Sequence, residues 1–448
     1  MSAPKHLSRR EFLRVASFSA AGLALAACAA PGAAPSGQST EGGDAPSGEK
    51  TTIRYHARIG QQEDTLYDMQ APKFMEENPN IELVRESFPG DEYETKIATM
   101  HAGGTMGDVI WSALGGAKIQ FAYGQEQIAA IDDLVAAQNI DLSEWYEGCI
   151  NAITLEGNLL GLPFKAHPGL AIVYYNQTAI EAAGGEIPTN DWTQEQHLEL
   201  AQLLTVREGD RTTQFGYLPH AGWKGLVTLT RAFGGELINE DGTQFLIAEE
   251  AGIQSINYLY DLFQTLNVAP APDQMLGAAN DMWISGVLGT YQGGTSVSVT
   301  DSAIGDAFEW MVVPNPKGPS GVGGSDYEVD AQCVTNASEH KEEAFQWVHY
   351  LCNHESGVQL GIIGGTVGGR PDVYGDEELL QHPYRVVFKE VMDNAMASRI
   401  TNNWRQTEAE VALDQLLQPL WAGSAQPDDA FIENVRSSIQ AIMDKPRP

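Results

Sequence analysis

The chain has 448 residues, which is more than one hydrophobic core accommodates and enough for two α/β lobes. Its formal net charge is -34 at pH 7, and this excess of carboxylates argues against nucleic acid as a partner, because nucleic-acid binding requires a basic surface. The net charge by itself identifies no ligand, since an acidic surface often serves only to keep an exported protein soluble.

The first part of the sequence has the features of an export signal. Residues 8–14 read Ser-Arg-Arg-Glu-Phe-Leu-Arg and resemble a twin-arginine signal, and the apolar segment after them is too short to span a bilayer as a stable helix. That segment ends in Leu-Ala-Ala-Cys, which resembles the lipobox of bacterial lipoproteins, whose cysteine carries the lipid. We therefore expect residues 1–27 to be a signal peptide and Cys28 to be the lipidated N-terminus. Residues 28–50 are rich in Gly, Ala, Pro and Ser and predict a flexible tether, which would hold the protein on the extracytoplasmic face of the cell membrane.

Strands and helices alternate in the part of the chain that follows the tether. Residues 52–57, 81–84 and 107–111 predict three strands from their content of β-branched and aromatic residues. Two helices are predicted between these strands, and the first of them carries Leu66 and Phe74 on one side. This alternation is typical of parallel βαβ units.

The stretch that begins at Leu162 has a distinctive order of features. It opens with Leu-Pro-Phe, which cannot continue a helix because proline lacks a backbone N–H donor. The apolar run at residues 171–175 then predicts a buried strand. A short helix is expected to begin at Asn176 and to end at the glycine pair 184–185. Thr193, with a glutamine three residues later, forms a capping-box pattern that predicts the start of the next helix.

This order resembles that of the family 1 extracellular solute-binding proteins, the receptors of sugar-importing ABC transporters. Their pattern here is Leu-Pro-Phe, Tyr-Tyr-Asn, a short helix, Gly, Pro-Pro and then Thr-Trp. The present chain has Thr189 in place of the second Pro, and Asp191 before Trp192. The Phe-Gly-Tyr sequence at 215–217 and the glycine-rich turn at 364–371 resemble later landmarks of the family. The resemblance covers nearly the whole chain after the tether.

The resemblance implies an α/β fold, namely the two-lobed fold of type II periplasmic binding proteins with a ligand cleft between the lobes. The first lobe is expected to comprise residues 51–165 and 314–364, and the second lobe residues 166–313 and 365–448. The implied function is capture of a mono- to oligosaccharide in the cleft and its delivery to the permease subunits of an ABC importer. No bond is broken in such a process, so we expect a monomeric transport receptor rather than an enzyme, with no cofactor and no metal.

A sugar site combines flat aromatic side chains, which cover the apolar faces of sugar rings, with polar side chains that bind the hydroxyls. Trp404 lies in a polar context where the family often has a cleft-facing aromatic residue, and it is therefore an aromatic candidate. Trp111 is expected at the end of a strand on the ligand side, and Trp223 in a loop after a strand. For each of these three residues, packing in the core is the alternative interpretation.

Polar candidates come from the same comparison. Lys165 and His167 lie on the segment that lines the floor of the cleft in the family. The other candidates follow predicted strands or the expected return crossing between the lobes, and they are Asp64 with its neighbour Glu63, Asp91 with Glu92, Asp326 with Tyr327, and Arg370. For any single acid among them, solvation at the surface is the alternative interpretation.

Two other kinds of function stay open from the sequence. The same fold could bind a polyamine, glycerol phosphate or a peptide. A phosphate would call for clustered arginines or a helix N-terminus, and only Arg58 and Arg370 are offered, whereas a cationic ligand would suit the acidic loops. A secreted carbohydrate-active enzyme would need two converging carboxylates, but the sequence contains no Gly-x-Ser-x-Gly, His-Glu-x-x-His or phosphate-loop motif.

The cysteines that follow the lipobox are Cys149, Cys333 and Cys352. Their number is odd and their spacing does not match a metal site. We expect three buried thiols, while the sequence alone leaves one disulfide open.

The lipobox interpretation predicts the effect of replacing one atom. Cys28→Ser removes the sulfur that would carry the lipid, so the variant should appear in the soluble fraction while the unchanged chain stays with the membrane. Immunoblotting of fractionated cells measures this distribution. Membrane retention of the variant would contradict the lipid anchor.

Overall fold

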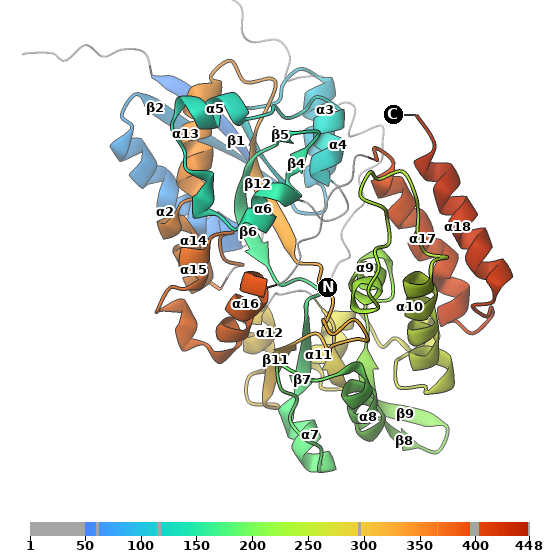
Figure 1. The fold of residues 1–448 in the computed structure, drawn as a ribbon. Helices are drawn as coiled ribbons and strands as arrows, with labels where there is room; N and C mark the ends of the chain where they lie inside the picture. Colours follow the sequence, from blue (N-terminus) through green and yellow to red (C-terminus); the bar gives the residue numbers. More distant parts are fainter. Residues whose placement is uncertain are drawn as a thin grey trace, which may run out of the picture. The chain divides into compact units, whose positions relative to one another are not determined.

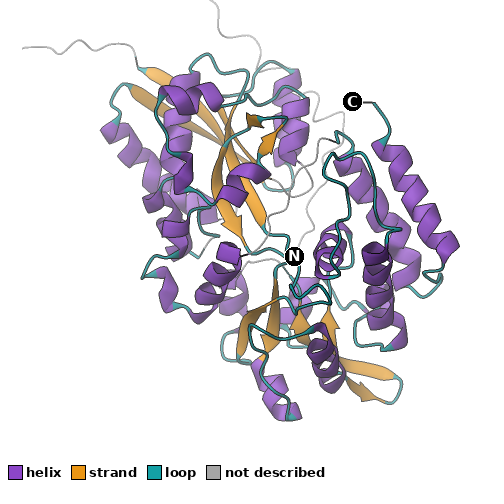
Figure 2. Ribbon diagram, in the orientation of Figure 1, coloured by secondary structure: helices purple, strands orange, loops and turns teal. Residues whose placement is uncertain are grey.

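The structure is a computed structural model (Figures 1 and 2). It describes residues 50–59, 62–113, 118–293, 297–364, 366–394 and 403–446, with the backbone alone for residues 297–300. The predicted signal peptide, Cys28 and nearly all of the predicted tether lie outside the described residues. Among the helices of the described part, none is both long enough and apolar enough to cross a membrane.

Five strands form a first sheet, in the spatial order β2 (Ile81–Pro89), β1 (Thr51–Ile59), β3 (Val109–Ala113), β12 (Glu328–Val334) and β6 (Leu162–His167). β1 is parallel to β2 and β3, as expected for βαβ units. β12 returns from much later in the sequence and runs antiparallel to both of its neighbours, β3 and β6. Figure 2 shows this sheet with helices beside it.

The predicted strands 52–57 and 81–84 are confirmed, and both are longer than predicted. The third strand lies two residues later than the predicted range 107–111, and all of its side chains are buried. Trp111 is therefore the middle residue of β3, and the prediction that it ends a strand was wrong. β3 has a strand on either side, and a buried central strand extends for as long as both of its faces are covered.

Helices α2 (Gln62–Glu77), α3 (Tyr93–Ala102) and α13 (Lys341–Leu351) pack against this first sheet or its neighbouring helices. The predicted apolar side of α2 is confirmed, because Leu66 and Phe74 are buried in the core. Trp347 of α13 is fully buried against the ring of Phe74, with the two centroids 5.1 Å apart. These contacts remove large apolar surfaces from water and so hold the sheet and helices together.

A second five-stranded sheet has the order β11 (Trp310–Pro314), β7 (Ile172–Asn176), β10 (Leu288–Tyr291), β9 (Arg211–Leu218) and β8 (Val206–Glu208). β7 is antiparallel to both β11 and β10, whereas β10 and β9 are parallel. The buried strand predicted at residues 171–175 is confirmed as β7, whose five residues are all buried.

The local signals around β7 correspond to the observed helix ends. The side chain of Asn176 accepts a hydrogen bond from the Ala179 N–H at the start of α7 (Gln177–Ala183), and this helix ends at Gly184 with φ of 72°. The predicted capping box of Thr193 is also formed, because both of its reciprocal hydrogen bonds are present at the start of α8 (Gln194–Leu204). Each of these predictions is confirmed.

The Leu-Pro-Phe segment forms the edge strand β6, although the sequence predicted only that it would not be helical. Proline has no N–H to donate, so it fits an edge strand, where one side needs no ladder bonds. Pro163 pairs with Ala331 next to an irregularity in the β6–β12 register. The chain then passes through residues 168–171 into β7, and it returns from β11 to β12 through residues 315–327.

The C-terminal part contains α17 (Gln406–Trp421) and α18 (Asp429–Met443), which pack against each other. Pro419 lies within the last turn of α17 and does not end the helix. Its carbonyl accepts hydrogen bonds from the N–H groups of Ser424 and Ala425, which close the end of the helix.

Cys149, Cys333 and Cys352 are free and buried, so the expectation of three buried thiols is confirmed. Burial raises the pKa of all three thiols, that of Cys149 to about 12.

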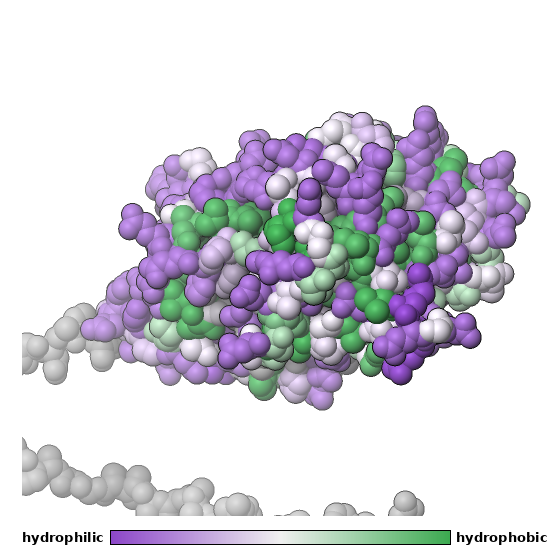
Figure 3. Space-filling model, turned by 90° about the horizontal axis from the view of Figure 1, so that it is seen from below, coloured by the Kyte–Doolittle hydropathy of each residue, from purple (hydrophilic) through white to green (hydrophobic). Residues whose placement is uncertain are grey.

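At the surface, apolar side chains form several small groups among polar ones on the face that Figure 3 shows.

Candidate functional site

The ammonium group of Lys165 is buried between two carboxylates. Its Nζ lies 2.5 Å from Oε1 of Glu63 and 2.9 Å from Oδ2 of Asp330. Glu63 also pairs with Arg58, whose Nη2 lies 2.9 Å from the same oxygen. No more than a tenth of the side chain of Lys165, Glu63 or Asp330 is exposed. Two cations and two anions thus compensate one another where unpaired charges would be very costly.

The protonation states follow from this pairing. Burial by itself would lower the pKa of Lys165, but Asp330 and Glu63 raise it overall. Burial would likewise raise the pKa of both carboxyl groups, yet the Lys165 cation lowers both overall. All three groups are therefore ionised at neutral pH.

Strand pairing continues this arrangement from Lys165 to His167. In the β6–β12 ladder, Lys165 is paired with Asp330 and His167 with Glu328. Residues two apart on a strand point to the same face, so the four side chains lie together on one side of the sheet. The His167 Nε2 lies 3.7 Å from Oε2 of Glu328. Burial lowers the pKa of His167 to about 4, so the ring is neutral at pH 7.

Glu328 connects the first sheet to helix α9 (Trp223–Ala232), because its carboxylate forms an ion pair with Lys224. Further along α9, the Arg231 side chain lies 3.1 Å from Glu236 and 3.8 Å from Asp326. Arg231 also donates to the Ser325 carbonyl at 2.5 Å. A series of charged contacts thus runs from α2 and β6, through β12, to α9.

Glu410 of α17 is the most strongly perturbed carboxyl group near Lys224. Burial raises its pKa to about 7; the nearby Asp326 and Asp414 act in the same direction, whereas Gln406 and Lys224 lower it. Near neutral pH this carboxyl group exists in both protonation states. A carboxylic acid that retains its proton can donate a hydrogen bond as well as accept one.

The aromatic candidates have different surroundings. The guanidinium carbon of Arg58 lies 3.5 Å from the centre of the Trp111 ring, so a cation covers that face of Trp111. Trp223 is the first residue of α9 rather than part of a loop, which corrects the prediction, and its buried ring stacks on Phe245 with centroids 5.9 Å apart. Trp404 is half-buried and stacks on Tyr123, with centroids 6.4 Å apart.

Three of the predicted residues have surroundings that differ from those of the charged series. Asp64 faces Arg85, which donates to its backbone carbonyl at 3.1 Å, and the neighbouring Glu63 is the acid that meets Lys165. Asp91 is exposed just before α3. Arg370 pairs with Glu144 at 2.6 Å and with Asp372 at 2.9 Å.

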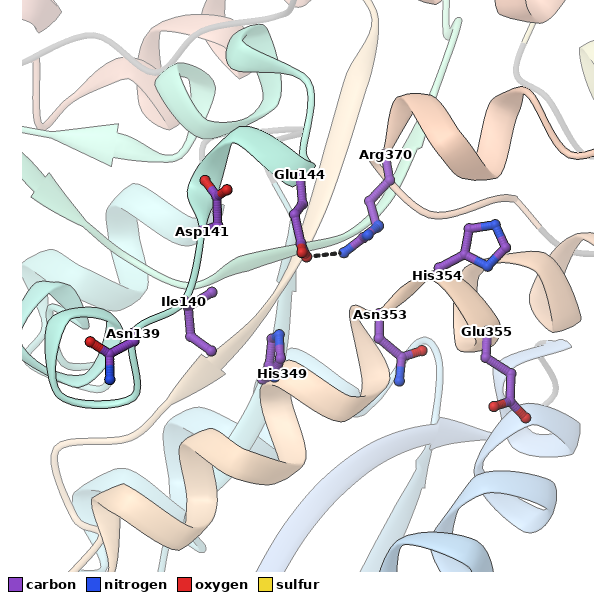
Figure 4. A pocket seen from close by; sticks show the side chains of 9 residues that line it. All are labelled: Asn139, Ile140, Asp141, Glu144, His349, Asn353, His354, Glu355 and Arg370. Atoms are coloured by element: carbon purple, nitrogen blue, oxygen red, sulfur yellow. Dashed lines mark hydrogen bonds and ion pairs between the residues drawn. The ribbon is translucent and has the colours of Figure 1, made fainter.

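Arg370 lines a separate shallow pocket of about 470 Å³ (Figure 4). Its Nη1 points at the Glu144 carboxylate across this pocket, and its remaining side is engaged by Asp372. The lining also includes Asn139, Ile140, Asp141, His349, Asn353, His354 and Glu355. Among the described residues, no group of three or more His, Cys, Asp or Glu side chains could hold a metal ion.

The structure therefore brings together Lys165, His167 and Asp326 from the predicted set. It adds residues that sequence reasoning did not select as binding candidates, namely Glu328, Asp330, Lys224, Arg231 and Glu410. Two of these could have been found from the sequence, because Glu328 and Asp330 alternate along a strand as Lys165 and His167 do. Their pairing with β6 depends on the sheet register, which the sequence does not contain.

The fold is that of the two-lobed periplasmic binding proteins, and comparisons with known proteins give the same class. The sequence profile of the bacterial extracellular solute-binding proteins matches residues 59–358, more than half of the chain. The chain belongs to this family. A Brucella abortus protein whose name describes it only as a binding protein is 21% identical over 413 residues, which cover 90% of this chain and 94% of that protein.

Two solved structures have a similar fold. An ABC substrate-binding protein of Listeria monocytogenes in complex with cycloalternan has a TM-score of 0.75 and 19% identity, and covers 88% of this chain and 99% of its own. Maltose-bound MalE3 of T. maritima has a TM-score of 0.71 and 19% identity, and covers 88% of this chain and 100% of its own. At these identities the similarity establishes the fold.

The raised pKa of Glu410 predicts a pH-dependent difference in stability. Between its ordinary pKa of 4.5 and its folded pKa of about 7, the folded state holds this proton more tightly than the unfolded state does, so the group costs stability as the pH rises through that window. Glutamine has no carboxyl group to ionise, so Glu410→Gln lacks this cost. The difference in unfolding free energy between the variant and the unchanged protein should therefore shift in favour of the variant as the pH rises from 5 to 8. The expected shift is about 1 kcal/mol, since partial exposure of the side chain reduces the effect.

Thermal unfolding of both proteins at several pH values measures this difference. Glu199→Gln, which changes an exposed acid on α8, is the matched control and should show no such trend. A constant difference between Glu410→Gln and the unchanged protein across this pH range would contradict the assignment.

Proposed function

We propose that the protein is an extracytoplasmic receptor of an ABC importer that captures a sugar and delivers it to the membrane permease. The observation that carries this proposal is the charged series along β6, β12 and α9. In it Lys165 pairs with Asp330, and Glu328 lies close to both His167 and Lys224. Sugar hydroxyls both donate and accept hydrogen bonds. A set of paired ions together with a neutral histidine offers donors and acceptors side by side, as hydroxyl recognition requires.

The charge balance of this series disfavours an anionic ligand such as glycerol phosphate. Arg58, Lys165, Lys224 and Arg231 each have a carboxylate partner, so none of these cations carries an uncompensated charge. A phosphate would have to displace one of these carboxylates. An uncharged saccharide only has to form hydrogen bonds with groups that are already neutralised in pairs.

The same balance supports one alternative ligand class. Near α9 the carboxylates are numerous, because Asp326 and Asp414 both lie near Glu410, as does Lys224. Asp326 also lies 3.8 Å from Arg231. A cationic ligand such as a polyamine would find favourable charges there. This class is therefore the second candidate.

The known ligands of similar proteins support a sugar as the first candidate. The L. monocytogenes structure contains cycloalternan, and the T. maritima structure contains maltose. Trp404, half-buried and stacked on Tyr123, is the aromatic side chain that we propose for contact with a sugar ring. We do not include the remaining candidates in the proposed contacts. Asp91 is exposed, Asp64 faces Arg85, and Arg370 is paired with Glu144 and Asp372. Arg58 covers a face of the Trp111 ring, and the Trp223 ring is buried against Phe245.

We further propose the cellular setting that the sequence predicts. Residues 1–27 would be removed, and lipid on Cys28 would anchor the chain to the cell membrane through the tether. The two lobes would comprise residues 51–165 with 314–364 and residues 166–313 with 365–448. The receptor would work as a monomer, and the sugar would leave it chemically unchanged.

A thermal-shift screen tests the proposed function. The Cys28→Ser chain is heated with neutral sugars, polyamines and glycerol phosphate in separate samples. A ligand at a hundred times its dissociation constant adds about 2.7 kcal/mol to the stability of the folded state. We expect a shift with one class of neutral saccharide and recovery of that sugar unchanged. A shift with polyamines alone would favour the second candidate, and breakdown of the sugar would indicate an enzyme.

Trp404 is expected to contribute stacking energy to the bound sugar. Trp404→Ala should weaken binding about tenfold, because the loss of a ring contact costs roughly 1.4 kcal/mol. Trp404→Phe retains an aromatic ring and should bind within about threefold of the unchanged protein by the same estimate. Titration calorimetry with the sugar identified in the screen measures both. Unchanged affinity of the folded Ala variant would remove Trp404 from the site.

A further inference from the structure

One buried amide side chain links the two segments that run between the sheets. The Nδ2 of Asn315 lies 2.6 Å from the carbonyl oxygen of Leu170, on the outgoing segment 168–171. The same nitrogen lies 3.0 Å from the carbonyl oxygen of Gly324, on the returning segment 315–327. Its two protons can therefore serve one carbonyl on each segment. Asn315 is only 5% exposed, so water does not readily replace these bonds.

Backbone and side-chain contacts reinforce this linkage. The Asn315 N–H donates to the Ala171 carbonyl at 3.0 Å, which extends the pairing of β11 with β7 by one residue. Gln292, which directly follows β10 and is also buried, donates its Nε2 to the Leu170 carbonyl at 3.0 Å. The Gln292 Oε1 accepts from the His220 N–H at 3.3 Å. The Leu170 carbonyl thus accepts hydrogen bonds from the side chains of both Asn315 and Gln292.

The returning segment packs so closely here that it requires glycine. A Cβ on Gly323 would lie 2.2 Å from the Asn315 carbonyl oxygen. A Cβ on Gly324, whose φ is +60°, would lie 1.9 Å from the Thr228 carbonyl oxygen of α9. The segment is therefore pressed against both Asn315 and α9, and this close approach is what allows the single amide to reach both carbonyls.

These segments adjoin the residues of the proposed site. Lys165 and His167 lie on β6, directly before the outgoing segment. Asp326 lies near the end of the returning segment, and Glu328 is the first residue of β12 after it. Any rotation of one sheet relative to the other must change the backbone at these segments, and the linkage restricts which rotations are available. We infer that Asn315 is a positioning residue for ligand capture, one that ties the outgoing and returning segments into a single pivot without touching the ligand.

This inference rests on the proposed function, in which the ligand binds best in one relative orientation of the two sheets. Without the amide, the ligand-free protein should sample more orientations, and a smaller fraction would be competent to bind. Apparent affinity falls in proportion to that fraction. The expected effect is therefore a wider range of orientations together with weaker binding.

The test compares Asn315→Leu with Asn336→Leu. Leucine is similar in shape to asparagine and donates no hydrogen bond. Asn336 is the control for the number of hydrogen bonds lost, because its Nδ2 also serves two backbone carbonyls, those of Glu126 at 3.0 Å and Ile128 at 2.9 Å. It is exposed and follows β12 at the end away from the returning segment. The measurement is a spin-label distance distribution in the ligand-free full chain, together with the affinity for the sugar found in the screen.

The labels are attached at two exposed positions, Glu82→Cys on β2 and Glu208→Cys on β8, in the Cys28→Ser background. The three native thiols are buried and should not react. We expect the distance distribution to broaden in Asn315→Leu only, with affinity reduced about tenfold, the order expected when two buried hydrogen bonds are lost. Asn336→Leu should leave both measurements unchanged.

A folded Asn315→Leu protein with the distribution of the unchanged chain would overturn the inference. If Asn315→Leu fails to fold, Gln292→Met is measured instead, because it removes the second side chain that donates to the Leu170 carbonyl. A distance distribution like that of the unchanged chain would again overturn the inference. If no sugar binds the unchanged chain, the proposed function fails by itself, and the ligand-free distribution still decides whether Asn315 forms the pivot.

Discussion

The buried ammonium group of Lys165 is the constraint on which the arrangement of the first sheet depends. A charge removed from water must meet partners at short range, and the partners of Lys165, which lies on β6, come from two other parts of the sequence, the start of α2 and the returning strand β12. The pairing of Lys165 with Glu63 and Asp330 holds only if all three elements keep their register. A shift of β12 by one residue would turn Asp330 to the opposite face and leave the ammonium group half-compensated.

In the proposed function, this compensation also determines which ligands the residues along β6 and β12 suit. Each cation of the series is neutralised by a carboxylate, and His167 is uncharged at neutral pH because burial lowers its pKa to about 4. The groups are polar but impose no strong net field of either sign along β6 and β12. Recognition of the proposed sugar would therefore depend on the direction of hydrogen bonds rather than on charge. The excess of carboxylates begins only near α9, where Glu410 relieves part of it by retaining a proton near neutral pH.

The sequence predicted most of the local structure, because local structure follows from local chemistry. Asn176, Gly184 and Thr193 mark helix ends through hydrogen bonds and backbone angles within a few residues of themselves. The site was predicted only in part. Lys165 and His167 were selected through the family resemblance. Asp64 and Glu63 were named together, since nothing in the sequence states which of two adjacent acids faces inward. Glu328 and Asp330 were missed because their role depends on pairing with a strand far away in the sequence.

The polar contacts along β6 and β12 and the linkage at Asn315 are parts of one mechanical unit. The outgoing segment begins directly after His167, the last residue of β6. The returning segment contains Asp326 and ends directly before Glu328, the first residue of β12. A change in the angle between the sheets must therefore alter the spacing between the ion pairs of β6 and β12 and those of α9. The Lys224–Glu328 pair is the contact that senses this change most directly, because its two residues belong to α9 and β12. Ligand hydroxyls that bridge the same groups would favour the angle at which this pair is formed, which couples recognition to the conformation of the pivot.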